Sequence, residues 1–161
     1  MKNIQKVLTD IIQESSKIFW VLFKVILPVI IVIRALELMG AIPYLARFLE
    51  PLTSFIGIDG SLGLVWMAAI LVNIYAGMAA FASLQPIFDY TVAETTILGL
   101  IILIAHSLPI EVAIARQSRV SAIFNLLFRF INAVIAGKIL NYIFVKFDLF
   151  NEQNSSILDI P

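Results

Sequence analysis

Long runs of apolar residues alternate with short polar stretches along this chain. Three of the runs, at residues 17–40, 61–84 and 121–147, are long enough to form helices that cross a membrane. A helix needs about 20 residues to cross a hydrocarbon core about 30 Å thick. The pattern therefore predicts an all-α polytopic membrane protein.

A fourth apolar segment, residues 95–120, is interrupted. Its continuous apolar part, residues 97–105, is about nine residues long, or roughly 14 Å of helix, which is half of a bilayer. The residues HSLP follow, and Pro109 removes a backbone donor from any helix that runs through it. A helical pattern then resumes as IEVAIARQSR. We predict a broken or re-entrant helix; the alternative is that Pro109 marks the membrane surface and the later charges are solvated.

The other stretches are expected at the membrane surface. Residues 1–16 place apolar residues at helical spacing between charges, which fits an amphipathic interfacial helix or the first turns of the next helix. Residues 41–60 contain Pro43 and Pro51 and are too polar to span, so a short interfacial helix and a turn are expected. The chain, a single domain of residues 1–161, then divides into an N-terminal segment, a membrane core and a polar tail, at residues 1–16, 17–147 and 148–161.

The composition supports a lipid environment. Of the 161 residues, 61% are hydrophobic and 14% are charged, and the mean hydropathy is +1.00. Soluble domains average roughly half apolar and about a quarter charged residues. The 11 basic and 11 acidic residues cancel, so a nucleic-acid partner is not expected. The absence of cysteine excludes disulfides and thiolate metal sites.

Charges outside the apolar segments indicate orientation only weakly. Lys2, Lys6 and Lys17 favour a cytoplasmic N-terminus, and the link at residues 85–94, which has no Lys or Arg, is expected outside. Most other basic residues lie within predicted helices. This weak bias suggests an antiparallel pair of copies with dual topology, or else a short protein with few loop charges.

Two small or polar positions in the charge-free segment are candidate binding residues. Asn73 and Gly77 are four residues apart and would share one face of a continuous helix. The Asn73 amide needs a hydrogen-bonding partner in lipid. The alternative role of the small residues around it is close helix packing.

The interrupted segment supplies the other candidate residues. Discontinuous helices in transporters direct freed peptide groups and half-helix dipoles at the solute. His106 and Ser107 would supply hydrogen bonds at the break, and Pro109 would start the second half-helix. Glu111 would lie in its first turn, where the dipole favours the ionised carboxylate and apolar surroundings favour the neutral form. It is therefore suited to exchange a coupling H⁺ or Na⁺, while Arg116 would pair with a carboxylate or attract an anionic solute.

Enzymatic chemistry and a bound cofactor are not expected. His106 is the only histidine and lies five residues from Glu111, so the chain has no HExxH metal motif. The chain also lacks a GxSxG motif and a loop that cradles phosphate.

Three features together resemble the nucleoside-recognition, or Gate, domain family. They are the small-residue stretch AAILVNIYAGMAAFASL, the break HSLPIE with the following ARQSR, and the closing FRFINAVIAGKIL. The resemblance covers roughly residues 18–147. The family includes spore-maturation proteins A and B, related short paired membrane proteins and a repeated element of ferrous-iron transport protein B, with concentrative nucleoside transporters as more distant relations.

The resemblance implies broken helices and re-entrant hairpins around a polar centre, with one copy as half of a functional unit. The other half would be a second copy or a sister Gate-domain chain of inverted topology. We therefore expect a half-size transporter or permease of the prokaryotic cytoplasmic (inner) membrane that moves a small polar solute. A nucleoside-like solute rests on analogy with the family alone. The alternative is a non-transporting scaffold or regulatory subunit that works through a partner membrane protein.

Overall fold

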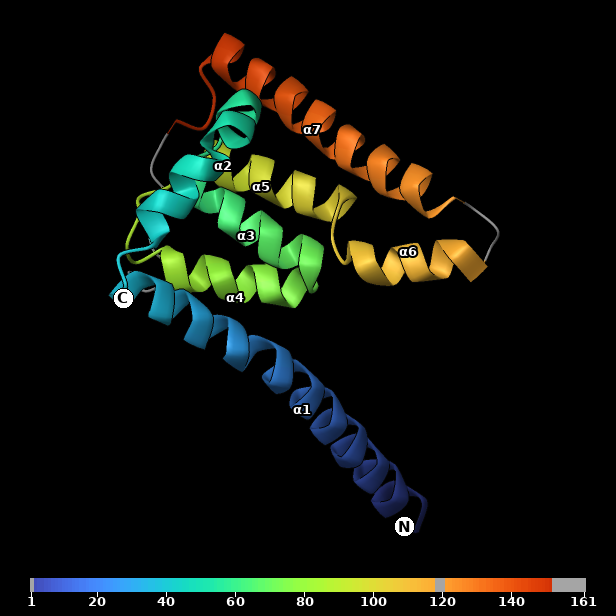
Figure 1. Cartoon of the computed structure of the whole chain (residues 1–161). Helices are drawn as coiled ribbons and strands as arrows, with labels where there is room; N and C mark the ends of the chain where they lie inside the picture. Colours follow the sequence, from blue (N-terminus) through green and yellow to red (C-terminus); the bar gives the residue numbers. More distant parts are fainter. Residues whose placement is uncertain (1, 118–120, 152–161) are drawn as a thin grey trace.

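A computed structural model describes residues 2–117 and 121–151, apart from the side chains of residues 2–5, 8, 113, 116 and 117. The described part is built from α-helices, which confirms the predicted all-α class (Figure 1). In chain order the helices are α1 (Lys2–Leu38), α2 (Ile42–Ile56), α3 (Gly60–Leu71), α4 (Ile74–Leu84), α5 (Val92–Ile104), α6 (Leu108–Gln117) and α7 (Ala122–Phe147).

Three helical stretches are long and apolar enough to cross a membrane. They are Thr9–Leu38 of α1, Val92–Val112 across α5 and α6, and Ala122–Phe147 of α7. Helices α2 and α3 are together also long and apolar enough to cross, but they are bent by 92° at the turn between them. By length and composition, the described residues therefore contain three helical stretches that could cross a membrane, or four if the bent pair is itself one crossing.

The N-terminal residues form the first turns of α1, which is one of the two arrangements that the sequence leaves open. Helix α1 is continuous over 37 residues, with Pro28 inside it. Its first half extends away from the other helices (Figure 1), and the described side chains of residues 6–21 are exposed. Its second half packs against α4, with Ile33 buried at the contact.

The predicted continuous span at residues 61–84 is wrong, because the segment folds back on itself. Helix α3 ends at Leu71, and α4 begins at Ile74 after two non-helical residues. Asn73 is the N-cap of α4, and its side-chain oxygen accepts a hydrogen bond from the Ala76 N–H at 3.0 Å. The two helices, with 12 and 11 residues, are each about 16–18 Å long, little more than half of a hydrocarbon core.

Two hydrogen bonds, each donated by a backbone N–H, place the open end of this hairpin. The Asp59 N–H donates to Glu94 Oε1 at 3.1 Å, which joins the start of α3 to the start of α5. The Ala93 N–H donates to the Phe150 carbonyl at 2.9 Å, which brings the end of α7 to the same level. We call this level, which also holds the connection at residues 85–91, the link end. The hairpin α3–α4 begins and ends there, as expected for a re-entrant element.

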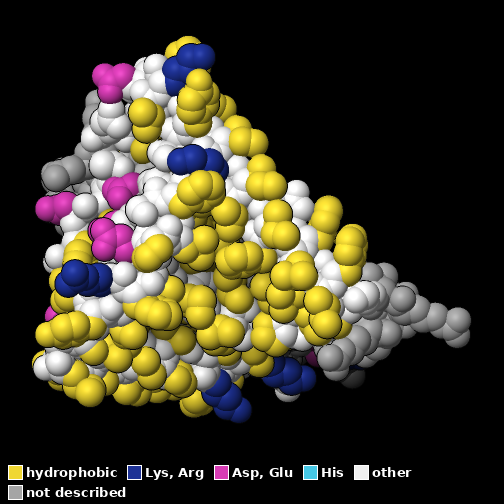
Figure 2. Space-filling model, turned by 45° about the horizontal axis from the view of Figure 1, so that its top comes forward, with side chains coloured by type: hydrophobic (Ala, Val, Ile, Leu, Met, Phe, Trp, Pro, Cys, Tyr) yellow, Lys and Arg dark blue, Asp and Glu magenta, His cyan; other side chains and the backbone are white. Residues whose placement is uncertain are grey.

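Helix α3 lies at the centre of the core and contacts α2, α4, α5 and α6. Its residues Leu62, Val65 and Trp66 are almost completely buried, as are Ile97 and Ile101 of α5. The outward-facing side chains are also largely apolar, and they cover most of the face seen in Figure 2. Lipid rather than water is the solvent that such a surface fits.

Candidate functional site

The break between α5 and α6 lies where the sequence predicts it. Helix α5 ends at Ile104 with Ala105 as its C-cap, and α6 begins at Leu108. Ser107, between them, has a φ of 50°. Residues other than glycine rarely adopt this left-handed backbone conformation. The stretch that is long and apolar enough to cross a membrane continues through the break and ends at Val112, three residues after Pro109.

Protein groups satisfy the peptide groups that the break frees. The Ser107 N–H donates to the Ala69 carbonyl at 2.9 Å, and the Trp66 indole N–H donates to the Ala105 carbonyl at 3.3 Å. Both partners belong to α3, and Ala69 lies two residues before its end. The α5–α6 break therefore lies beside the α3–α4 turn, and the two interruptions share one level of the bundle.

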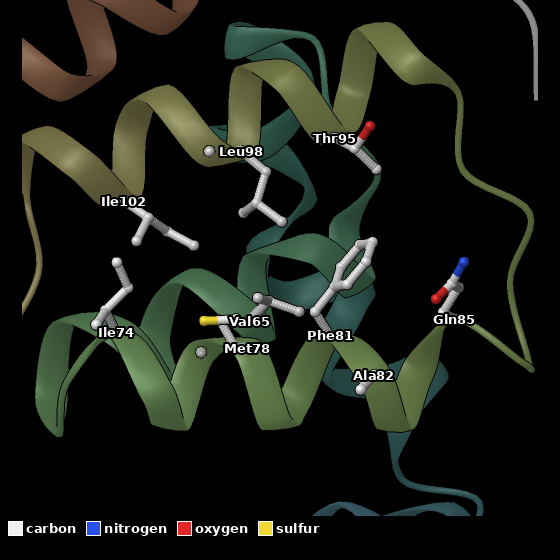
Figure 3. Close-up of a pocket in the computed structure, with 11 residues that line it drawn as sticks. Val65, Ile74, Met78, Phe81, Ala82, Gln85, Thr95, Leu98 and Ile102 are labelled. Carbon is white, nitrogen blue, oxygen red and sulfur yellow. The ribbon is translucent and has the colours of Figure 1, made fainter. Parts of the chain in front are cut away.

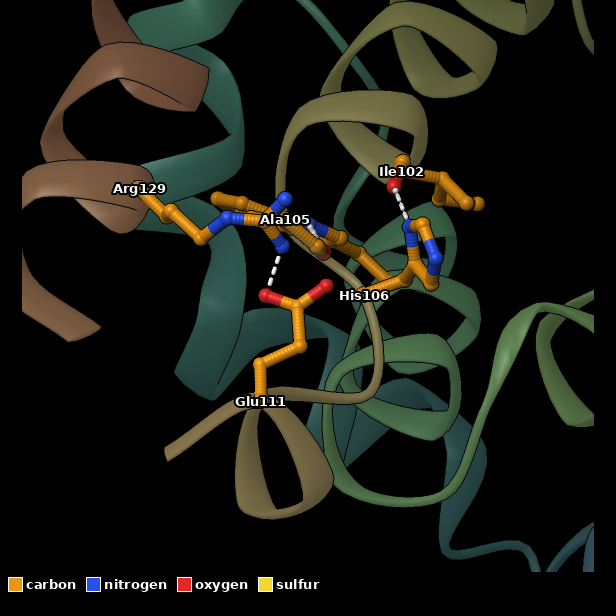
Figure 4. Close-up of polar contacts among 6 residues, drawn as sticks. Ile102, Ala105, His106, Glu111 and Arg129 are labelled. Carbon is orange, nitrogen blue, oxygen red and sulfur yellow. Dashed lines mark hydrogen bonds and ion pairs between the residues drawn. The ribbon is translucent and has the colours of Figure 1, made fainter. Parts of the chain in front are cut away.

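His106 is oriented by the last turn of α5. Its Nδ1 lies 2.9 Å from the Ile102 carbonyl oxygen (Figure 4). A carbonyl only accepts, so Nδ1 carries the hydrogen and Nε2 is left as the acceptor in the neutral ring. The side chain is half-buried, so Nε2 is available to a ligand at the break.

Glu111 forms an ion pair with Arg129 of α7 (Figure 4). The two side chains are 23% and 31% exposed, so they are neither buried in the core nor fully open. Charges at membrane depth are costly unless they are paired, and this pair neutralises both within the chain. The carboxylate expected to bind a coupling ion therefore has an arginine partner in this conformation.

Ala69 connects two of the other predicted residues. It accepts the Ser107 hydrogen bond, and it also faces Gly77, where an added Cβ would lie 2.8 Å from the Ala69 Cβ. Gly77 is thus a close-packing position of the hairpin. Asn73 lies at the hairpin's turn and caps α4, so the two do not share a helix face as the sequence suggested.

Two of the predicted site residues, Pro109 and Arg116, contribute no contact at the break within the described part of the chain. Pro109 is the second residue of α6 and is exposed. The side chain of Arg116 lies outside the described part of the chain. Conversely, Trp66, Ala69 and Arg129 belong to the site although sequence reasoning did not select them. A charge within an apolar span marks Arg129 as unusual, but its partner is 18 residues away and cannot be read from helical spacing.

A second polar cluster closes the link end. The Asp59 carboxylate accepts from the Ser61 N–H at 2.8 Å and from the Ser61 hydroxyl, and that hydroxyl lies 2.7 Å from the Tyr90 hydroxyl. Thr91 and Glu94 form a reciprocal capping box at the start of α5. Burial raises the pKa of Tyr90 from 10.0 to about 12. Among the described residues, no group of three or more His, Cys, Asp or Glu side chains is placed to hold a metal ion.

The chain is similar to a membrane protein of a bacterium. Over 98 residues the chain is 30% identical to the uncharacterized membrane protein YvoD of Bacillus subtilis (strain 168). The match covers 61% of this chain but only 30% of the length of that protein. No family model matches the chain, and no solved structure matches it. Together with the apolar helices, the relative supports an integral membrane protein.

Proposed function

We propose that this chain is a half-size transport module that works as a dimer and moves a small polar solute through the membrane. The observation that carries the proposal is the contact between two interrupted helical elements, made by the Ser107 N–H and the Ala69 carbonyl. In transporters, substrate sites lie where discontinuous helices meet near the middle of the bilayer. In the proposed arrangement the hairpin α3–α4 enters from the membrane surface, so its half-length brings its turn to such a depth, beside the break in α5–α6.

The polar groups at the break supply plausible ligands for the solute. His106 offers Nε2 as an acceptor, and the Ser107 hydroxyl and the Asn73 amide lie on the two interruptions. Glu111 and Arg129 lie one turn further along α6 and on α7. In the proposed cycle, the Glu111 carboxylate exchanges its arginine partner for H⁺ or Na⁺ when the solute binds or leaves. The nucleoside-like solute suggested by the resemblance to Gate domains remains one candidate within this class.

The dimer completes the solute site in this proposal. One copy contributes one hairpin and one broken helix, which cover the site from one side only. A second copy of inverted orientation, or a sister Gate-domain chain, would contribute the other side. The matched region fills less than a third of the Bacillus relative, so that chain has room for a second segment of the same size. A prokaryotic cytoplasmic membrane is the proposed location.

Uptake into proteoliposomes tests the transport step. A panel of radiolabelled nucleosides, amino acids and organic acids is offered to vesicles that contain the wild-type protein, Glu111→Gln or Lys138→Gln. Lys138 is a matched control because it is a charged residue of the membrane core that lies over the Phe55 ring, away from the break. We expect uptake of one solute class, its loss in Glu111→Gln and its retention in Lys138→Gln. No uptake of any solute, or equal uptake by both variants, would count against the proposal.

Labelling of introduced cysteines tests the inverted pair. The chain has no native cysteine, so Lys6→Cys and Asn151→Cys each carry a single thiol. Helices α1, α5–α6 and α7 place these positions at opposite ends of the molecule (Figure 1). With one orientation, a membrane-impermeant maleimide labels each position from one side only. With inverted pairs, each position is labelled about half from either side, and strictly one-sided labelling would exclude the inverted homodimer.

The ion pair also favours a second candidate function. Because Arg129 already neutralises Glu111, the break region is self-contained and suits a membrane scaffold or regulatory subunit that works through a partner protein. This candidate predicts that no solute is taken up and that a partner membrane protein is recovered with the chain after cross-linking. Recovery of such a partner together with the absence of transport would decide between the two.

A further inference from the structure

A groove runs between α4 and α5 on the outside of the bundle. It has a volume of about 380 Å³ and is walled by these two helices, with Val65 of α3 between them (Figure 3). On its α5 wall, a Cβ added to Gly99 would meet nothing within 4 Å. On its α4 wall, Ala82 is exposed. Two small residues thus leave the groove uncovered over its middle.

The polarity of the groove changes along its length. Ile74 and Ile102 lie at its inner end, whereas Gln85 and Thr95 lie at the opposite end, next to the connection between α4 and α5 (Figure 3). The Thr95 hydroxyl bonds to the Thr91 and Val92 carbonyls of its own helix. The Gln85 side chain, by contrast, makes no hydrogen bond to another described residue. The groove is therefore apolar inside, with an amide at the link end.

The length of the groove matches one leaflet of a bilayer. It follows α4, whose 11 residues give about 16 Å, and half of a hydrocarbon core is about 15 Å. It begins at the link end and stops at the level of the two helix interruptions. A spanning helix of a second copy would cross the whole core and extend beyond the groove at its inner end. A lipid acyl chain starts at the membrane surface and ends in the middle of the bilayer.

We propose that this groove binds one acyl chain of a phospholipid from the leaflet at the link end, with the Gln85 amide donating to the lipid's carboxylic ester. The chain would pack on Val65, Met78 and Leu98 and fill the space in front of Gly99. Its end would contact Ile74, which follows Asn73, and Ile102, whose carbonyl accepts from His106. A bound lipid would thus support both interruptions. This binding site does not depend on the proposed transport activity.

Native mass spectrometry of the detergent-purified protein tests the site, with phosphatidylglycerol as the probe. Gly99→Phe and Ala82→Phe fill the groove from opposite walls, and the Cβ added at Gly99 meets no atom within 4 Å. Leu103→Phe is the matched control, because Leu103 is on α5 and is 66% exposed. We expect one retained phospholipid in the wild type and in Leu103→Phe, and its loss in both groove variants. Circular dichroism verifies that all three variants are folded.

Two further measurements decide what occupies the groove. A phospholipid with a photoreactive diazirine at the end of its chain should cross-link to the peptides that carry Ile74 and Ile102. Equal lipid retention in all variants would mean that only loosely associated membrane lipid is present, which overturns the proposal. Disulfide formation between copies that carry Gly99→Cys and Ala82→Cys would place a second copy in the groove, and would also overturn it.

Discussion

The indole N–H of Trp66 donates to the Ala105 carbonyl at 3.3 Å, across the gap between the re-entrant hairpin and the broken helix. The same ring stacks on Phe130 of α7, with centroids 5.3 Å apart. Trp66 thus bonds to one of the carbonyls that the break frees and also fills the space between three elements.

We expect Trp66→Phe to destabilise the protein by about 1–3 kcal/mol, because the substitution keeps an aromatic ring but leaves a buried carbonyl without its donor. Thermal unfolding in detergent measures the effect. Trp20→Phe is the control, since Trp20 is 57% exposed on α1. Similar shifts for both variants would show that the hydrogen bond contributes nothing specific.

Substitution by alanine should have opposite effects on stability at two of the glycines. Gly77→Ala places a methyl group 2.8 Å from the Ala69 Cβ, so the hairpin must open, at a cost of about 1–3 kcal/mol. Gly99→Ala meets open space and gains helix propensity of about 1 kcal/mol. Chemical denaturation of both variants measures whether the free energy of unfolding rises or falls. A stabilising Gly77→Ala would contradict the close packing.

The Glu111–Arg129 pair should show strong coupling in a double-mutant cycle. Either Glu111→Gln or Arg129→Gln leaves one charge unpaired at membrane depth, whereas the double variant removes both charges. We expect the double variant to be more stable than the sum of the single effects predicts, by about 0.5–3 kcal/mol. Additive effects in unfolding experiments would mean that the two side chains do not pair in the membrane.

Stability should fall at high pH because of Tyr90. Its pKa is raised from 10.0 to about 12 by burial, so the folded state favours the neutral phenol. The contribution is complete below pH 10 and is lost as the pH rises through about 12. Tyrosinate absorbance measures the titration. Tyr90→Phe should remove this part of the pH dependence, and an unchanged profile would assign it to another group.

The break in α5–α6 could be predicted from the sequence because its causes are local. Pro109 cannot continue a helix that comes from Ile104, and the apolar run before it is too short to span. The long helix α7 follows from composition in the same way, with Ser121 as its N-cap.

The turn at Asn73 was missed because its cause is mostly tertiary. The segment has no proline and no charge there, and its apolar residues suit one long helix as well as two short ones. Its stability comes from α3 packing against α4 at Gly77 and from the contact of Ala69 with Ser107. The single local signal is the preference of asparagine for N-cap positions, which is weak in isolation. Arg129 was missed as the partner of Glu111 for the same reason, since their pairing depends on how α6 packs against α7.

The re-entrant hairpin also determines whether the chain crosses the membrane an odd or an even number of times. In the three-crossing arrangement, α3 and α4 return to the link end, so helices α1, α5–α6 and α7 make an odd number of crossings. A polypeptide with this arrangement emerges on the side opposite to the one where it entered. If two such units were joined end to end by a short linker, the second would be inserted upside down relative to the first. Tandem duplication of this fold would therefore produce an antiparallel pair within one polypeptide, without an added crossing helix.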